Sequence, residues 1–175
     1  MKPSILIGIV ILLALTGGVF YYYNSIGGFE EVKVTEKSNV RYLIQGKAFK
    51  GNVKTEPLFR QLFDNTEAFL KVNPKGYLCA YFKQVPTKEN DFEADAIIGA
   101  LVQDTTELLN DEYKNFAISF DYTLHAYKAA PPTVAGETEE TLHTYAKEHH
   151  FRLENAVLEH YISQQEFAVE IPVSQ

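Results

Sequence analysis

The order of the expected strands and helices constrains the fold of this chain more than any single motif. From residue 32 onward, stretches with alternating apolar side chains and stretches with helical spacing follow one another twice, in the order strand, helix, strand, strand. Residues 48–50 (AFK) align with residues 126–128 (AYK), and residues 78–82 with residues 157–161, at nearly the same spacing. We therefore expect an α+β domain of two pseudo-symmetric β-α-β-β repeats, which form an antiparallel sheet with the helices on one face.

Turn residues and prolines indicate where the elements of each repeat begin and end. Pro57 suits the first turn of a helix, and an Asn-Pro pair ends that helix. A turn is expected at Ser38-Asn39, and Pro172 indicates that the last strand lies at a sheet edge, since proline cannot donate to an interior ladder. The expected strands are residues 32–37, 40–50, 77–83, 92–102, 116–124, 156–162 and 167–173, and the expected helices are residues 57–72 and 138–150, with an acidic connection at residues 104–115.

An apolar segment precedes this domain. Residues 5–23 carry no charge and are long enough, at about 1.5 Å per residue, to cross a hydrocarbon core of roughly 30 Å. The segment ends in three tyrosines, which are typical of a membrane interface, and it lacks the small-residue cleavage site of a signal peptide, the competing interpretation. The sequence thus predicts a transmembrane anchor at residues 1–24, a short linker at residues 25–30 and a domain at residues 31–175.

The charges that flank the apolar segment predict its orientation. Lys2 precedes the segment, whereas Glu30 and Glu31 are the first charges after it. The positive-inside rule then keeps the short N-terminus in the cytoplasm and puts the domain on the extracytoplasmic side. We therefore expect a single-pass membrane protein that contacts the lipid bilayer through residues 5–23.

Composition excludes several functions. The net charge of −7, from 16 Lys and Arg against 23 Asp and Glu, argues against nucleic-acid binding, which needs clustered positive charge. The one cysteine, Cys79, excludes an intramolecular disulfide and a cysteine-based zinc site. His143 and His149 are not spaced as a metal-binding pair on one helix face, and the sequence has no phosphate-binding or dinucleotide motif. We therefore expect no metal and no cofactor.

Five segments, in this order, resemble the GyrI-like small-molecule-binding domain, a family related to the SOUL haem-binding fold. They are VRYLIQGKAFKG (40–51), PLFRQLFDNTEAFL (57–70), GYLCAYF (76–82), FEADAIIGALV (92–102) and FAVEIPV (167–173), which together span essentially the whole domain. The resemblance implies a groove between the two repeats, lined by aromatic side chains and carboxylates, for cationic or amphipathic ligands.

A membrane anchor in front of such a domain resembles one branch of the family, whose animal members include an autophagy receptor of the endoplasmic reticulum. The receptor function is not expected here, because no long acidic tail follows the last strand. The regulator function of other members is not expected either, because the chain has no helix-turn-helix segment. Some members are hydrolases of strained small molecules that use an aromatic residue and a glutamate. The family often has tryptophan in its groove, and this chain has none.

The resemblance implies two candidate carboxylates, on two late strands. Glu159 is the matching position, and Glu170 in the closing strand is the second candidate. By alternation, Glu159 shares its strand face with Val157 and Tyr161. A carboxylate among apolar neighbours either pairs with a cation or has a raised pKa. The competing interpretation is a solvated glutamate without a role.

Tyrosines on the strands are expected to line the same groove, since a ring face can contact a cation. The candidates are Tyr42, Tyr81 and Tyr161. We therefore expect a membrane-anchored domain that binds a small amphipathic or cationic molecule, with Glu159 as the counter-charge. Two alternatives stay open, namely a hydrolase of a reactive small electrophile in the same groove and an anchored protein-interaction domain. The sequence assigns no catalytic residue.

Overall fold

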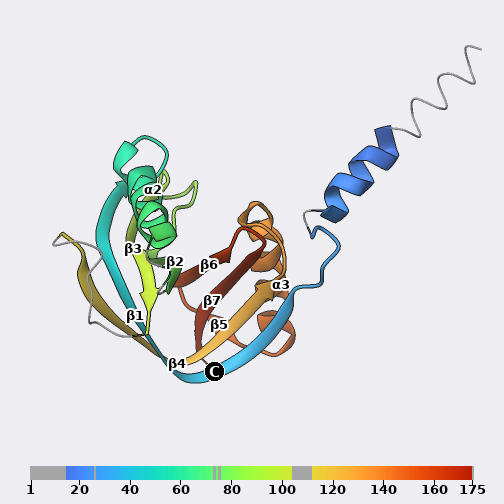
Figure 1. Cartoon of the computed structure of the whole chain (residues 1–175). Coiled ribbons are helices and arrows are strands. Elements are labelled where there is room, and N and C mark those ends of the chain that lie inside the picture. The colour runs from blue at the N-terminus through green and yellow to red at the C-terminus, as the bar shows by residue number, and fades with distance from the viewer. Residues whose placement is uncertain (1–14, 26, 73, 75, 104–111, 175) are drawn as a thin grey trace, which may run out of the picture.

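The computed structural model describes residues 15–25, 27–72, 74, 76–103 and 112–174. Residues 15–25 form a helix that extends away from an α+β domain (Figure 1). In chain order, the elements of the domain are β1 (Lys33–Asn52), α2 (Pro57–Val72), β2 (Gly76–Gln84), β3 (Glu93–Val102), β4 (Lys114–Lys128), the short 3₁₀ turn η1 (Pro132–Val134), α3 (Ala135–Glu148), β5 (Arg152–Leu153), β6 (Val157–Ser163) and β7 (Glu166–Ser174).

The two halves of the domain have the same strand pairing. In the first half β1 pairs with β3 and β3 with β2, and in the second half β4 pairs with β7 and β7 with β6. Between the halves, the two first strands, β1 and β4, pair with each other, as do β2 and β6. All these pairs are antiparallel, and together they form a closed circuit. The expected α+β class with an antiparallel sheet and helices on one side is confirmed.

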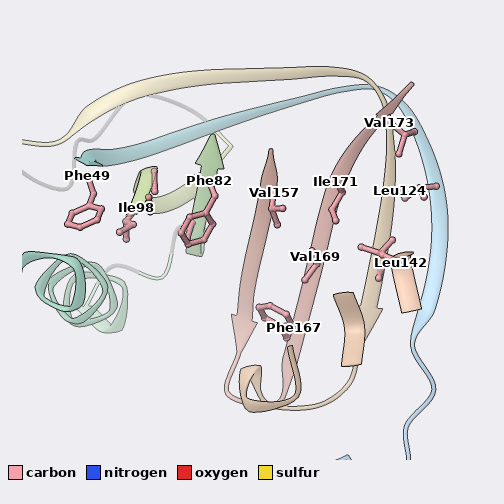
Figure 2. Packing of buried hydrophobic residues seen from close by; sticks show 14 of the residues in the cluster. Phe49, Phe82, Ile98, Leu124, Leu142, Val157, Phe167, Val169, Ile171 and Val173 are labelled. Carbon is pink, nitrogen blue, oxygen red and sulfur yellow. The ribbon is translucent and has the colours of Figure 1, made fainter. Parts of the chain in front are cut away.

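Alternate side chains of the strands pack on opposite faces of the sheet. On one face, Phe167, Val169 and Ile171 of β7 pack with Leu142 of α3, and the rings of Phe49 and Phe82 lie towards α2 (Figure 2). This helix-covered face holds the largest cluster of buried apolar residues. The period-two pattern of each strand therefore separates side chains that contact the helices from side chains that do not.

The opposite face lines the interior of the closed sheet. The rings of Tyr81 on β2 and Phe120 on β4 are 5.9 Å apart, although these two strands do not pair. The rings of Tyr42 on β1 and His160 on β6 are likewise 5.5 Å apart across the interior. A second apolar cluster, which includes the buried thiol of Cys79, fills part of this space. Because water is excluded there, the pKa of the Cys79 thiol is raised.

Two local predictions are wrong. The expected turn at Ser38-Asn39 is absent, because β1 continues through it and pairs with β4 on both sides. Asn39 adopts φ 53°, a left-handed conformation that asparagine tolerates. The last strand, β7, is not an edge strand, because it pairs with β4 and with β6. Pro172 stands at the end of the β4–β7 ladder, where a missing N–H disturbs the pairing least.

The predicted membrane anchor lies largely outside the described residues. Its last part, residues 15–23, belongs to the projecting helix. Within the described part of the chain, no helix has both the length and the apolar character that a membrane crossing requires. The side chains of this short helix are nevertheless exposed, with Val19, Phe20 and Tyr22 each at least 64% accessible.

Candidate functional site

The strongest candidate site lies on the helix-covered face where the two halves meet. There β2 and β6 pair in the register that joins Ala80 to Glu159 and Phe82 to Val157. Ala80, Phe82 and Val157 belong to the apolar cluster beneath the helices. Glu159 therefore lies among apolar side chains at the junction. Strands from both halves contribute these side chains, the apolar floor of the junction.

Glu159 forms a pair with a tyrosine on the same strand. The Tyr161 hydroxyl donates a 2.5 Å hydrogen bond to Oε2 of Glu159. The ring of Tyr161 packs edge-on against Phe63 of α2, with centroids 5.6 Å apart, and against Phe167 of β7 at 5.3 Å. Helix α2 and the closing strand thus fix the orientation of the hydroxyl that holds the carboxylate.

The surroundings of Glu159 raise its pKa to about 7. Desolvation is the main cause, since the apolar floor removes water from the carboxylate. The hydrogen bond from Tyr161 opposes this effect, and the negative charge of Glu139 on α3 reinforces it. The pKa of Tyr161 is also raised, first by burial and then by the neighbouring carboxylate. A carboxyl group in this state can serve as a counter-charge or as an acid–base group near neutral pH.

Two cavities open on the helix-covered side of this junction. The α2 cavity, of about 450 Å³, is lined by Leu70, Gly76, Leu78, Pro132, Tyr161 and Ile162, and also by polar residues that include Glu67 and Lys71. The α3 cavity, of about 630 Å³, is lined by Lys83, Asn90, Glu139, His143, Glu154 and Val157 among others. Val157, which lines the α3 cavity, and Tyr161, which lines the α2 cavity, flank Glu159 on the same strand face, while Glu159 itself lines neither cavity.

A separate polar cluster occupies the interior face of the sheet. Glu170 of β7 is fully buried, and its carboxylate accepts hydrogen bonds from the Tyr42 hydroxyl at 2.7 Å and the Thr123 hydroxyl at 2.9 Å. The Lys37 ammonium, one third exposed, completes an ion pair with Glu170 at 3.2 Å. Burial and the bond to Glu170 raise the pKa of Tyr42. This carboxylate is therefore already neutralised by the chain itself.

His160 extends the interior cluster. Its Nδ1 lies 3.1 Å from the Tyr77 hydroxyl, and its Nε2 is 3.8 Å from the Glu170 carboxylate. Burial lowers the pKa of His160 to about 3, with further contributions from His125 and Lys37. Desolvation likewise raises the pKa of Tyr77 to about 12. Among the described residues, no group of three histidine, cysteine or acidic side chains is arranged to hold a metal ion.

The structure divides the five residues expected at the ligand site between two faces. Glu159 and Tyr161 lie together on the helix-covered face. Tyr42 and Glu170 lie together in the interior, and Tyr81 points into the same interior, because it pairs with Leu158 and contacts Phe120. The sequence did not indicate Glu139 or the two cavities, since these depend on how the helices pack over the junction.

Comparison with known proteins identifies the fold. Neither a protein-family model nor a curated protein matches the sequence. In structure, the chain is similar to a hydrolase from Listeria innocua, with a TM-score of 0.53 and 14% identity over 82% of this chain and 92% of that one. It is also similar to an integron cassette protein from Vibrio cholerae, with a TM-score of 0.55 and 14% identity over 82% and 95%.

The C-terminal domain of EcmrR is a third similar structure, with a TM-score of 0.54 and 11% identity over 83% of this chain and 98% of that domain. The chain shares the fold of these three structures. At these identities the likeness concerns the fold alone.

Proposed function

We propose that the groove at the β2–β6 junction binds a small cationic or amphipathic molecule, with Glu159 as its counter-charge. The observation that supports this most is a partly buried carboxylate in an apolar floor, whose neighbours on the same strand face, Val157 and Tyr161, each line a cavity. A cation gains more from a charge in such surroundings than from one in water, because the local dielectric constant is lower. The rings of Tyr161 and Phe63 supply aromatic walls that attract a cation further.

The interior carboxylate has a different role in this proposal. Glu170 is fully buried and already engaged by Lys37, Tyr42 and Thr123. A ligand would have to replace these partners without access to the helix-covered cavities. We therefore assign Glu170, together with Tyr42 and Tyr81, to the stability of the interior and not to ligand contact.

Photolabelling with a matched pair of probes tests the proposal. One probe joins a benzophenone to a trimethylammonium group, and the other replaces that group by the neutral, equally large 3,3-dimethylbutyl group. In the full chain we expect labelling by the cationic probe at the junction and weaker labelling by the neutral one. Glu159→Gln should reduce the affinity for the cationic probe by about tenfold or more, because it removes a charged partner in low-dielectric surroundings.

The matched control is Glu166→Gln, which changes a β7 glutamate that binds Tyr127. This control should leave labelling by both probes unchanged. Equal labelling of the wild type and Glu159→Gln by the cationic probe would contradict the counter-charge role.

A hydrolase that acts in the same groove is the second candidate. The observation that favours it is the hydrogen-bonded Glu159–Tyr161 pair, whose carboxyl group has a pKa of about 7 and is thus suited to deprotonate a water molecule. A hydrolase, unlike a domain that only binds, converts its ligand into a product. A small epoxide probe incubated with the chain would be recovered with one water molecule added, and Glu159→Gln would abolish that product.

We further propose that residues 5–23 anchor the chain in a bilayer, with the domain on the extracytoplasmic side. The uncharged sequence and the flanking charges support this. The exposed apolar side chains of residues 15–23, which continue onto Phe29, also favour contact with lipid.

A further inference from the structure

We propose that the ligand of the junction groove is an elongated, single-chain amphiphile with a cationic head, whose tail fills the α2 cavity and whose head lies in the α3 cavity. This inference rests on the proposed function and adds the shape, polarity and direction of the ligand. It follows from three features of the two cavities, namely their alignment along β6, their unequal polarity and their charge.

The alignment of the cavities sets the shape of the ligand. Val157 lines the α3 cavity and Tyr161 lines the α2 cavity, with Glu159 between them on the same strand face. On the neighbouring strand, Lys83 lines the α3 cavity and Leu78, which pairs with Tyr161, lines the α2 cavity. Val157 and Tyr161 are separated by roughly 13 Å along the strand, at about 3.3 Å per residue. A compact ligand fills one cavity, whereas a flexible chain can occupy both.

The α2 cavity is suited to an apolar tail. Leu70 and Leu78 line it together with Ile162 and the ring of Tyr161. The two charged residues that line it, Glu67 and Lys71, form an ion pair with each other at 2.8 Å. The cavity therefore offers apolar surface without net charge, and burial of methylene groups there is favourable.

The α3 cavity is suited to a cationic head. The carboxylates of Glu139 and Glu154 line it, and the cation that also lines it, Lys83, is paired with Asp95 at 3.7 Å. Nε2 of His143 lies 3.9 Å from the carboxylate of Glu139. Because two carboxylates line this cavity and its lysine is already paired, the cavity has an excess of negative charge, so a positive head group is favoured there over a negative one.

Two probes of opposite label position test the direction of binding. Both are decyltrimethylammonium, with a photoreactive diazirine either on the last carbon of the tail or next to the head group. The full chain is labelled in nanodiscs of zwitterionic lipid, and the labelled peptides are identified by mass spectrometry. We expect the tail label on residues 67–71, 76–78 and 161–164, and the head label on residues 139–143 and 153–157. A reversed pattern, labels in one cavity only or labels outside both cavities would overturn the inference.

Two pairs of variants test the separate roles of the cavities. Leu70→Asn should weaken binding of the decyl probe by about tenfold and leave a butyl probe unaffected, since only the longer chain reaches Leu70. The control is Leu58→Asn, because Leu58 lies on the same helix and is 49% exposed. Glu139→Gln should weaken both probes by about threefold, whereas the control Glu140→Gln, at an exposed neighbouring position, should not.

These outcomes separate the two proposals. If Glu159→Gln leaves all labelling unchanged, the proposed function fails and this inference fails with it. If labelling depends on Glu159 but stays within one cavity, or if Leu70→Asn weakens the butyl and decyl probes equally, only the elongated ligand is excluded.

Discussion

His160 shows how a single residue inside the closed sheet couples folding to pH. The imidazole is 2% exposed, and its surroundings lower its pKa to about 3. In the unfolded chain the same group binds a proton below its ordinary pKa of 6.5. The unfolded state therefore takes up a proton that the folded state excludes, and the free energy of unfolding decreases as the pH falls from about 6.5 towards 3.

This pH dependence is testable by replacement of one side chain. We expect His160→Leu to reduce the slope of unfolding free energy against pH by up to about 1.4 kcal/mol per pH unit in that window. The exposed His143 on α3 is the matched control, and His143→Leu should keep the wild-type slope. Urea titrations at a series of pH values give the free energies. An unchanged slope in His160→Leu would show that the folded state accommodates a charged imidazole.

At the candidate site, the sequence predicts which side chains of one strand share a face, because side chains alternate along a strand. Glu159 and Tyr161 are two residues apart, so a strand at this position puts both on one face, and the structure has them hydrogen-bonded. Alternation does not say which face of another strand turns towards the helices. For this reason Tyr81, which was expected beside Glu159, faces the interior instead.

Among the elements, long-range pairing explains the predictions that were wrong. The polar pair at Ser38-Asn39 resembles a turn, but β4 pairs with β1 on both sides of it and keeps the strand continuous. Pro172 indicated an edge strand, but the second half places β7 between β4 and β6. The helices and the remaining strands were predictable because their periodicity is local, as in β7, where Phe167, Val169 and Ile171 alternate with residues of the other face.

The uncharged segment at residues 5–23 gives a prediction about membrane attachment. We expect the full chain to stay in the membrane fraction during alkaline carbonate extraction, because residues 5–23 are uncharged. The double variant Ile9→Lys, Leu13→Lys should be released, since each lysine at the centre of a span opposes insertion by about 2.5–3.5 kcal/mol. The control Ile9→Val, Leu13→Val keeps the segment apolar and should remain bound. Complete extraction of the wild-type chain would contradict the anchor.

On the scale of the whole molecule, the closed pairing of two similar halves creates the candidate site. The β2–β6 junction brings together strands from both halves, with α2 on one side and α3 on the other. The junction therefore brings together a ring from α2, a carboxylate from β6 and a second carboxylate from α3. No local sequence pattern predicts this combination, because it arises only when the halves pair.

The central claim, that ionised Glu159 is the counter-charge for a bound cation, is tested most directly by the pH dependence of binding. The dissociation constant of the benzophenone–trimethylammonium probe is measured between pH 5 and pH 9, for the wild type and for Glu159→Gln. Because the pKa of Glu159 is about 7, we predict that wild-type affinity is constant at high pH and falls by up to about tenfold per unit below pH 7. Glu159→Gln and the neutral probe should show no such decrease. A wild-type affinity that does not change with pH, or the same decrease in Glu159→Gln, would contradict the account.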